Sequence, residues 1–365
     1  MLKSAIAVNF LCCFIFWGCT SSPKKQTAQN QRETINDTLP LKEFIFSENQ
    51  PFKQCHASTL LHLPDGRFLV AWFGGTKEKN DDVGIWLSKG RPGEWSKPAQ
   101  VAKIRNDAHW NPVLFRSKQG TIYLFFKVAK EIDDWETWVQ TSNDDGQSWS
   151  VAKELIPNDK GGRGPVKNKP IILSDGSWLA GASHEKNRCH VFVDRSIDNG
   201  ETWTAMPYIE FGDTSLIDAC VIQPTLWEST PGNVHMLARS GAGAICRSDS
   251  KDYGKTWTAL TKTNLPNPNS GIDLTKLPGG VLALAYNPDT IDYGARAPLL
   301  LALSYDNGKT WPDQLTIEAG NKDDEFSYPA VISFGDTIAM TYTWQRKNIA
   351  FWMGNSDAIR KSKLH

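Results

Sequence analysis

The sequence predicts an all-β protein, a six-bladed β-propeller with Asp-box repeats, and two observations carry that prediction. First, the pattern Ser-x-Asp-x-Gly-x-x-Trp occurs four times, after a worn copy that lacks the Asp. The five copies begin at Ser88, Ser142, Ser196, Ser250 and Ser304, so each starts 54 residues after the last. Second, a turn that contains glycine is followed by an apolar strand six times, in step with the boxes. A fixed period of this length is typical of repeat architectures.

Each box predicts a hairpin turn that is stabilised by hydrogen bonds among its own residues. Its Asp can accept backbone N–H bonds, and its Gly tolerates a positive φ. The closing Trp is expected to bury its ring against the neighbouring unit. We therefore expect the boxes to fold the protein rather than to touch a substrate.

Each unit predicts a four-stranded antiparallel sheet, with the box between its third and fourth strands. The expected inner strands are 56–63, 111–116, 169–173, 223–227, 271–277 and 328–332. The expected second strands are 67–73, 121–127, 177–182, 233–239, 281–286 and 337–344. One such sheet cannot bury both faces, but six arranged radially can. No box follows Trp344 in the sixth unit, so we expect residues 41–46 to supply its outer strand and close the ring.

The N-terminal residues predict export. Lys3 and the apolar run 5–17 have the form of a signal sequence, and the run is too short to span a bilayer. It ends at Gly18-Cys19, which is similar to a bacterial lipoprotein cleavage site. We expect a lipoprotein anchored through Cys19 in the periplasm or on the outer membrane, with ordinary secretion or an uncleaved anchor as alternatives. The expected divisions are a signal peptide with lipobox at 1–19, a flexible tether at 20–40, the propeller at 41–357 and a C-terminal tail at 358–365.

The composition excludes some classes of partner. Lys+Arg and Asp+Glu balance at 40 each, so no global field attracts nucleic acid or an anionic membrane. The 15 Trp suit packing between blades and stacking on sugars. Cys55, Cys189, Cys220 and Cys246 have no CxxC spacing and thus no metal signature, while disulfides among them stay open. We expect a monomer with no cofactor or metal; calcium binding is left open.

The boxes and blade order resemble the sialidase (neuraminidase) superfamily over roughly residues 50–355. The chain is most similar to bacterial BNR-repeat sialidase-like proteins, which share segments like His56-Ala57-Ser58-Thr59 and Phe326-Ser327-Tyr328-Pro329-Ala330. This resemblance implies a site at the centre of the ring, on the face opposite the boxes and lined by the starts of the innermost strands. It also implies an exo-acting glycoside hydrolase that removes a terminal acidic sugar, sialic acid or a related one, from a glycan.

The resemblance implies three arginines that hold the carboxylate of the substrate, since a guanidinium matches a carboxylate bidentately. Arg239 and Arg296 match the second and third of these. The first position is occupied by His56 instead, so true sialic acid is in doubt as the substrate. An imidazole at the channel mouth can serve as acid/base or as a sugar ligand.

The resemblance also implies the catalytic residues. Tyr328 matches the nucleophile, and a phenol suits this role because an anionic nucleophile would be repelled by the carboxylate; sialidases are the tyrosine exception among glycosidases. Asp82 matches the acid/base, with Asp81 the alternative register. Gln223 stands where the activating Glu is expected, and an amide cannot take the phenol's proton. Glu228 lies further along the same strand.

Several weaker candidates lie at inner-strand starts or in the expected wall of the same funnel: His109, Asn111, Lys169, Gln223, Trp344 and Arg346. The structural alternatives are arginines salt-bridged at blade ends, a tyrosine packed on the channel and aspartates that cap loops. Two other functions stay open. One is a lyase or hydrolase acting on a uronic acid, with His56 and Tyr328 as its acid/base pair. The other is a non-catalytic propeller that binds glycans through Trp and Arg.

Overall fold

The computed structural model describes residues 40–47, 50–185 and 188–361. These residues belong to one compact unit that begins at Pro40. The expected lipobox and all but the last residue of the expected tether lie outside the described residues. Among the helices of the described part, none is long and apolar enough to cross a membrane.

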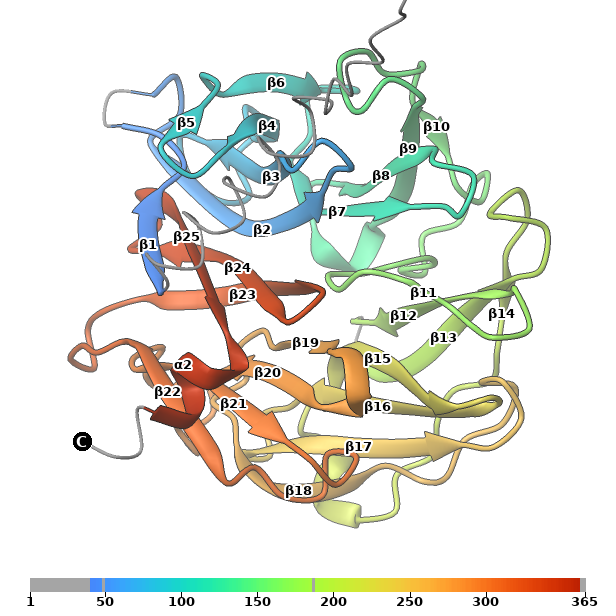
Figure 1. The fold of residues 1–365 in the computed structure, drawn as a ribbon. Coiled ribbons are helices and arrows are strands. Elements are labelled where there is room, and N and C mark those ends of the chain that lie inside the picture. Colours follow the sequence, from blue (N-terminus) through green and yellow to red (C-terminus); the bar gives the residue numbers. More distant parts are fainter. Residues whose placement is uncertain (1–39, 48–49, 186–187, 362–365) are drawn as a thin grey trace, which may run out of the picture. The chain divides into compact units, whose positions relative to one another are not determined.

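The strands form six antiparallel sheets around a centre (Figure 1). The first sheet has β2 (Gln54–His62), β3 (Phe68–Gly75), β4 (Gly84–Arg91), β5 (Glu94–Trp95) and β6 (Ala99–Ala102). The second has β7 (His109–Arg116), β8 (Ile122–Val128), β9 (Glu136–Ser142) and β10 (Lys153–Glu154). The third has β11 (Ile171–Ile172), β12 (Trp178–His184), β13 (His190–Ser196) and β14 (Thr204–Ala205).

The remaining sheets continue the series. The fourth has β15 (Ile222–Thr230), β16 (Asn233–Arg239), β17 (Ala244–Ser250) and β18 (Thr261–Pro266). The fifth has β19 (Asp273–Lys276), β20 (Leu282–Tyr286), β21 (Leu299–Ser304) and β22 (Asp313–Glu318). The sixth has β23 (Phe326–Phe334), β24 (Thr337–Trp344), β25 (Asn348–Asn355) and β1 (Leu41–Phe44). The described loops add 3₁₀ turns at Ile132–Asp134, Thr214–Leu216 and Pro278–Gly280.

The N-terminal strand closes the ring, as the sequence predicted. β1 pairs antiparallel with β25, in a register that places Leu41 opposite Met353. In Figure 1 the blue β1 lies beside the red β25. The six-bladed propeller is therefore confirmed, with one unit shared between the two ends of the described chain. The predicted inner strand at 169–173 is shorter than expected, because only Ile171–Ile172 pairs, directly after Pro170, which has no N–H to give to a ladder.

The boxes have the predicted hydrogen bonds. In the last box, the Ser304 hydroxyl donates to Asp306 at 2.9 Å and accepts from the Gly308 N–H at 2.8 Å. Asp306 also accepts from the backbone N–H and the hydroxyl of Thr310, at 2.9 and 2.6 Å. Trp311 packs with Trp227 and other residues of the preceding sheet. The hydrogen bonds of this box thus stabilise its own turn, and its Trp packs its sheet against the preceding one.

The C-terminal residues form the short helix α2 (Ser356–Lys361), and Ile359 is fully buried in the core between the fifth and sixth sheets. The boundary expected at residue 357 therefore falls inside this helix. Of the cysteines in the described chain, Cys189 and Cys220 form a disulfide, whereas Cys55 and Cys246 are buried free thiols. This pairing answers the question that the sequence left open.

Candidate active site

A cavity of about 430 Å³ opens at the centre of the ring, and all six sheets or their loops contribute to its lining. The lining includes these predicted residues: Asn111, Gln223, Arg239, Arg296, Tyr328 and Arg346. Arg239 ends a second strand, and Arg346 lies in the turn between β24 and β25. Because the strands alternate in direction, the third strands begin at this end of each sheet and reach their boxes at the opposite end. The cavity therefore lies on the face opposite the boxes, as the resemblance implied.

A recurring distortion aims the inner-strand residues at the cavity. Asn111, Gln223 and Tyr328 have φ of 41°, 55° and 52°, a left-handed conformation that costs a non-glycine residue about 1–2 kcal/mol. Each of these three residues lies at a register shift, a β-bulge, between its own strand and the next strand of the sheet. Such bulges re-aim side chains and occur next to active sites. In the first sheet the residue at the same place is Ala57, with φ 52°.

Arg239 and Tyr328 meet at the base of the cavity. Arg239 Nη1 donates to the Tyr328 hydroxyl at 2.6 Å and to Gln223 Oε1 at 3.1 Å, while its Nε donates to Asn269 Oδ1 at 3.0 Å. Asn269 is held in turn by Asp292, at 2.9 Å. The guanidinium is buried and rigidly placed, and one of its faces lies 5.5 Å from the Tyr328 ring centre.

Two more arginines share one carboxylate. Arg296 donates to Glu325 Oε1 at 2.8 Å, and Arg346 Nε donates to Glu325 Oε2 at 2.9 Å. Arg346 Nη1 is also bonded to Glu78. Burial opposes the charge on Glu325, but its hydrogen bond and ion pair with Arg346 outweigh this, so its pKa lies below the ordinary value. The Arg296 guanidinium lies 5.6 Å from the Tyr328 ring, so the guanidinium groups of Arg239 and Arg296 both approach this tyrosine.

His56 lies behind Tyr328 rather than in the lining described for the cavity. The two rings are 4.2 Å apart, and His56 is 2% exposed. Its Nε2 accepts from Arg346 Nη2 at 3.4 Å, and within the described chain its Nδ1 has no hydrogen-bond partner. Burial, followed by the charges of Arg346 and other cations, holds the pKa of His56 well below its ordinary value. His56 is therefore neutral at physiological pH, and its expected catalytic role stays a prediction.

Glu185 was not predicted, and it brings a carboxyl group to the cavity directly after β12. It accepts from the Ser183 hydroxyl at 2.9 Å and from Gln223 Nε2 at 3.3 Å. Burial raises the pKa of Glu185, although the Arg239 charge opposes this. A carboxyl group with a raised pKa can hold a proton at higher pH than usual, which is what a proton donor requires. No sequence pattern pointed to Glu185, because it lies in a turn outside the inner strands.

Asp81 and Asp82 lie in a neighbouring hollow of about 550 Å³, which shares Lys79 with the cavity. Asp82 accepts from the backbone N–H and the hydroxyl of Thr76, at 2.8 and 2.6 Å. Burial opposes ionisation of Asp82, but the bonds from Thr76 outweigh it and lower its pKa. Neither aspartate is among the residues described as lining the cavity, so the acid/base role expected of them stays a prediction.

The other candidates have structural partners. Lys169 is bound to Asp273 at 2.9 Å, and His109 accepts from the Ile104 N–H at 2.7 Å. Glu228 accepts from Ser174 and Gly232 at the far end of its strand, and Trp344 packs with aromatic side chains. The structure therefore does not bring these four residues into the described lining of the cavity.

Lys167 was missed, and it lies beneath Tyr328. Its Nζ is 5.9 Å from the Tyr328 ring centre and donates to Asn168 Oδ1 and to the Ile272 carbonyl, both at 3.0 Å. It is also bonded to the Pro329 carbonyl. An ammonium group has three donors, and here each has an acceptor. Burial lowers the pKa of Lys167 to about 7.

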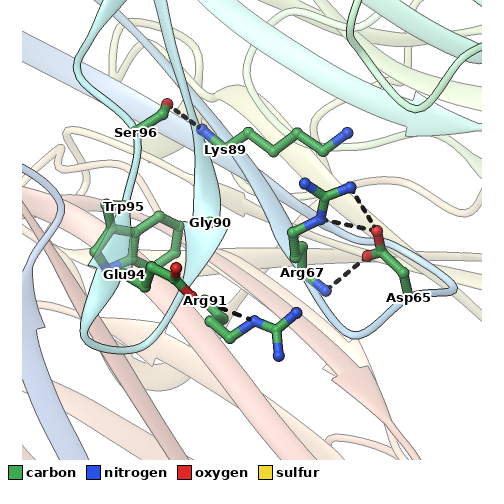
Figure 2. Close-up of a pocket in the computed structure, with 8 residues that line it drawn as sticks. All are labelled: Asp65, Arg67, Lys89, Gly90, Arg91, Glu94, Trp95 and Ser96. Atoms are coloured by element: carbon green, nitrogen blue, oxygen red, sulfur yellow. Dashed lines mark hydrogen bonds and ion pairs between the residues drawn. The ribbon is translucent and has the colours of Figure 1, made fainter.

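A larger hollow of about 560 Å³ surrounds the worn box of the first sheet. Figure 2 shows its lining, in which Arg67 is paired with Asp65. Lys89 Nζ is bound to the Asp145 carbonyl at 2.7 Å. None of the predicted site residues lines this hollow, so its size does not make it the site.

Comparison with known proteins agrees with this geometry. The model of the BNR repeat-like domain matches residues 66–340. A sialidase of Paraclostridium sordellii is 21% identical over 257 residues, which are 57% of this chain and 59% of that protein. The chain thus spans less than two thirds of this relative.

Solved sialidase structures share the fold. The Hadza microbial sialidase Hz136 has a TM-score of 0.73 at 16% identity, over 87% of this chain and 69% of that one. The NanB sialidase from Streptococcus pneumoniae has a TM-score of 0.70 at 14% identity, over 90% and 73%. These structures show the shared fold, and the BNR repeat-like domain model, which matches more than half of the chain, shows the family. The chain belongs to the BNR repeat-like domain family and is a sialidase-like β-propeller.

Proposed function

We propose that this protein is a glycoside hydrolase that removes a terminal carboxylated sugar from a glycan. One observation carries the proposal: Tyr328 lines a central cavity, and its hydroxyl lies 2.6 Å from a buried guanidinium nitrogen of Arg239. A tyrosine nucleophile beside arginines is suited to a sugar whose carboxylate would repel an anionic nucleophile. The sialidases that share the fold support the same class of reaction.

The proposed reaction has two steps. The Tyr328 oxygen attacks the anomeric carbon and its phenolic proton passes to water in the cavity, while the glycosidic bond breaks and a carboxyl group protonates the departing oxygen. Water then attacks the anomeric carbon, the bond to Tyr328 breaks, and the same carboxylate takes the proton from the water. The released Tyr328 oxygen takes a proton back from solvent water. Arg239 and Arg296 hold the sugar carboxylate throughout.

Two carboxyl groups are candidates for the proton donor. Glu185 lines the cavity and has a raised pKa, whereas Asp82 lies in the adjoining hollow and has a lowered one. A donor must be protonated at the working pH, so these observations favour Glu185. Asp82 is suited to the role only if the Thr76 bonds break when substrate binds.

The alternative uronate lyase would need a nitrogen of His56 at the substrate. Since His56 packs behind Tyr328, the geometry favours hydrolysis. A panel of sialyl, uronyl and neutral glycosides tests the proposal. Release of reducing sugar from the carboxylated members alone supports it, and absorbance from a new C=C bond would show a lyase. Saturable binding without turnover would show a glycan-binding propeller.

We also propose that the protein is exported and anchored through a lipid on Cys19, as the N-terminal pattern suggests. Incorporation of a radioactive or clickable fatty acid tests this. Wild-type protein should become labelled in a bacterial host, and a Cys19→Ala variant should not. Labelling of both proteins, or of neither, would contradict the anchor.

A further inference from the structure

We propose that Arg346, from the turn between β24 and β25 of the sixth sheet, completes the carboxylate-binding site together with Arg239 and Arg296. This inference rests on the proposed function and deepens it. It identifies the third group that holds the carboxylate and explains how the site works without an arginine in the first sheet.

The first sheet leaves a gap in the site. At its bulge lies Ala57, whose methyl group offers no hydrogen bond, while the equivalent residues of three other sheets are Asn111, Gln223 and Tyr328. The neighbouring His56 is buried behind Tyr328. A neutral imidazole cannot balance a carboxylate as a guanidinium can. The first sheet therefore supplies no cation at this place.

Arg346 belongs to the sixth sheet, and its side chain lies beside His56 of the first sheet. Its Nη2 lies 3.4 Å from His56 Nε2, and its side chain lines the cavity with Arg239 and Arg296. Gln345 and Arg346 both have φ of 52°, and the Lys347 N–H donates to the Trp344 carbonyl at 3.0 Å, so the two residues are the central pair of a type I′ hairpin turn.

The bonds that fix Arg346 still leave donors for a ligand. A guanidinium has five N–H groups. Arg346 uses one each for Glu325, Glu78 and His56, which leaves two. Within the described chain the Arg296 guanidinium donates to Glu325 alone, so most of its N–H groups are also uncommitted. Two guanidinium groups oriented by one shared carboxylate can thus present N–H groups to a second carboxylate.

The ion pairs of the cluster leave Arg239 without a carboxylate partner among the described salt bridges. Arg296 and Arg346 pair with Glu325 and Glu78, whereas Arg239 donates to the uncharged groups of Tyr328, Gln223 and Asn269. The lining as a whole holds equal numbers of basic and acidic side chains, so a carboxylate would be held by the local guanidinium groups and not by a net positive field: Lys79, Arg239, Arg296 and Arg346 against Glu78, Glu131, Asp133 and Glu185. Replacing Glu78 by an uncharged residue should strengthen carboxylate binding.

The test compares an acid with its ester. Affinities for sialic acid and glucuronic acid, and for the methyl ester of each, are measured by calorimetry with wild-type protein, Arg346→Met, Arg346→Lys and Glu78→Gln. We expect wild type to bind one of the acids at least about 10-fold more tightly than its ester. Arg346→Met should lower this ratio to about 2-fold, Arg346→Lys should keep an intermediate ratio, and Glu78→Gln should raise it.

Arg105 provides a matched control. It also makes two ion pairs, each at 2.6 Å with Asp107 and Glu136, but it does not line the cavity. Arg105→Met should leave the acid-to-ester ratio unchanged. An unchanged ratio in folded Arg346→Met would overturn the inference while leaving the proposed function intact. Wild type that does not distinguish acid from ester would refute the proposed carboxylate site itself. If Arg346→Met does not fold, Arg346→Lys and Glu78→Gln decide the outcome.

Discussion

The replacement of Tyr328 by Phe separates catalysis from structure. The change removes one oxygen, which accepts a hydrogen bond from Arg239 at 2.6 Å. A hydrogen bond to a charged group contributes about 1.5–3 kcal/mol. Arg239 keeps its bonds to Asn269 and Gln223, so we expect the low end of that range. With an unfolding entropy of about 2.1 cal/mol/K per residue, about 1.5 kcal/mol lowers the Tm of a domain of this length by about 2 °C.

Activity should fall far more than stability. If Tyr328 is the nucleophile, turnover of the preferred glycoside should fall at least about 10³-fold. The affinity for the free carboxylated sugar should change by less than about 10-fold, because the arginines remain in place. Steady-state hydrolysis, calorimetric binding and thermal unfolding measure these three quantities.

Tyr342→Phe is the matched control for this experiment. The Tyr342 hydroxyl also makes a 2.6 Å bond to a charged group, Glu318, but lies in the core of the sixth sheet. It should lower Tm by a similar amount and leave turnover within about 2-fold. Folded Tyr328→Phe that retains more than a tenth of wild-type turnover would refute the role of Tyr328 as nucleophile.

The remaining predictions concern Glu185, Asp198 and Cys189. Glu185→Gln should abolish cleavage of glycosides with poor leaving groups but spare activated aryl glycosides; if Asp82→Asn has this effect instead, the proton donor has been misassigned. Because burial raises the pKa of Glu185, activity that depends on its protonated form should be lost as pH rises through that raised value. Bonds from its own box lower the pKa of Asp198 to about 2, so its contribution to stability is present above pH 3.8 and is lost as pH falls through 2. Wild type and Asp198→Asn should therefore differ in Tm at pH 6 and converge near pH 2, and a constant difference would contradict this. Cys189→Ser should cost about 3–4 kcal/mol, since the disulfide to Cys220 closes a loop of 31 residues, and urea unfolding that shows no loss would contradict the estimate.

The fold could be predicted from the sequence because its determinants are local and repeated. Each box needs only a Ser, an Asp and a Gly within a few residues, and the same hydrogen bonds recur at Asp144, Asp198, Asp252 and Asp306. Ring closure was predictable for a related reason, since a sixth unit without a box lacks a strand. The C-terminal helix was missed because α2 has only six residues, too few for a periodic pattern.

Those residues of the candidate site that lie on the repeated strands could be predicted from the sequence, whereas those that lie on the connections between strands could not. Tyr328, Gln223 and Arg239 occupy inner or second strands, whose order along the chain fixes their place in the ring. Glu185 lies in a turn, and Glu325 lies just outside a strand. Their contact with the cavity or its arginines depends on how neighbouring blades meet. A single sequence carries no local signal for such contacts between blades.

The break in register of the first inner strand bears on the place predicted for His56. The resemblance implied that His56 stands in the place of the first arginine, but the ladder breaks after His56, and Ala57 takes the left-handed conformation. His56 is therefore equivalent to Ser327, the residue before Tyr328, and not to Tyr328 itself. A one-residue difference reverses the side of the strand to which a side chain points. The bulge of the first inner strand therefore presents a methyl group, and we propose that the neighbouring turn, whose Arg346 lies beside His56 and lines the cavity, supplies the guanidinium instead.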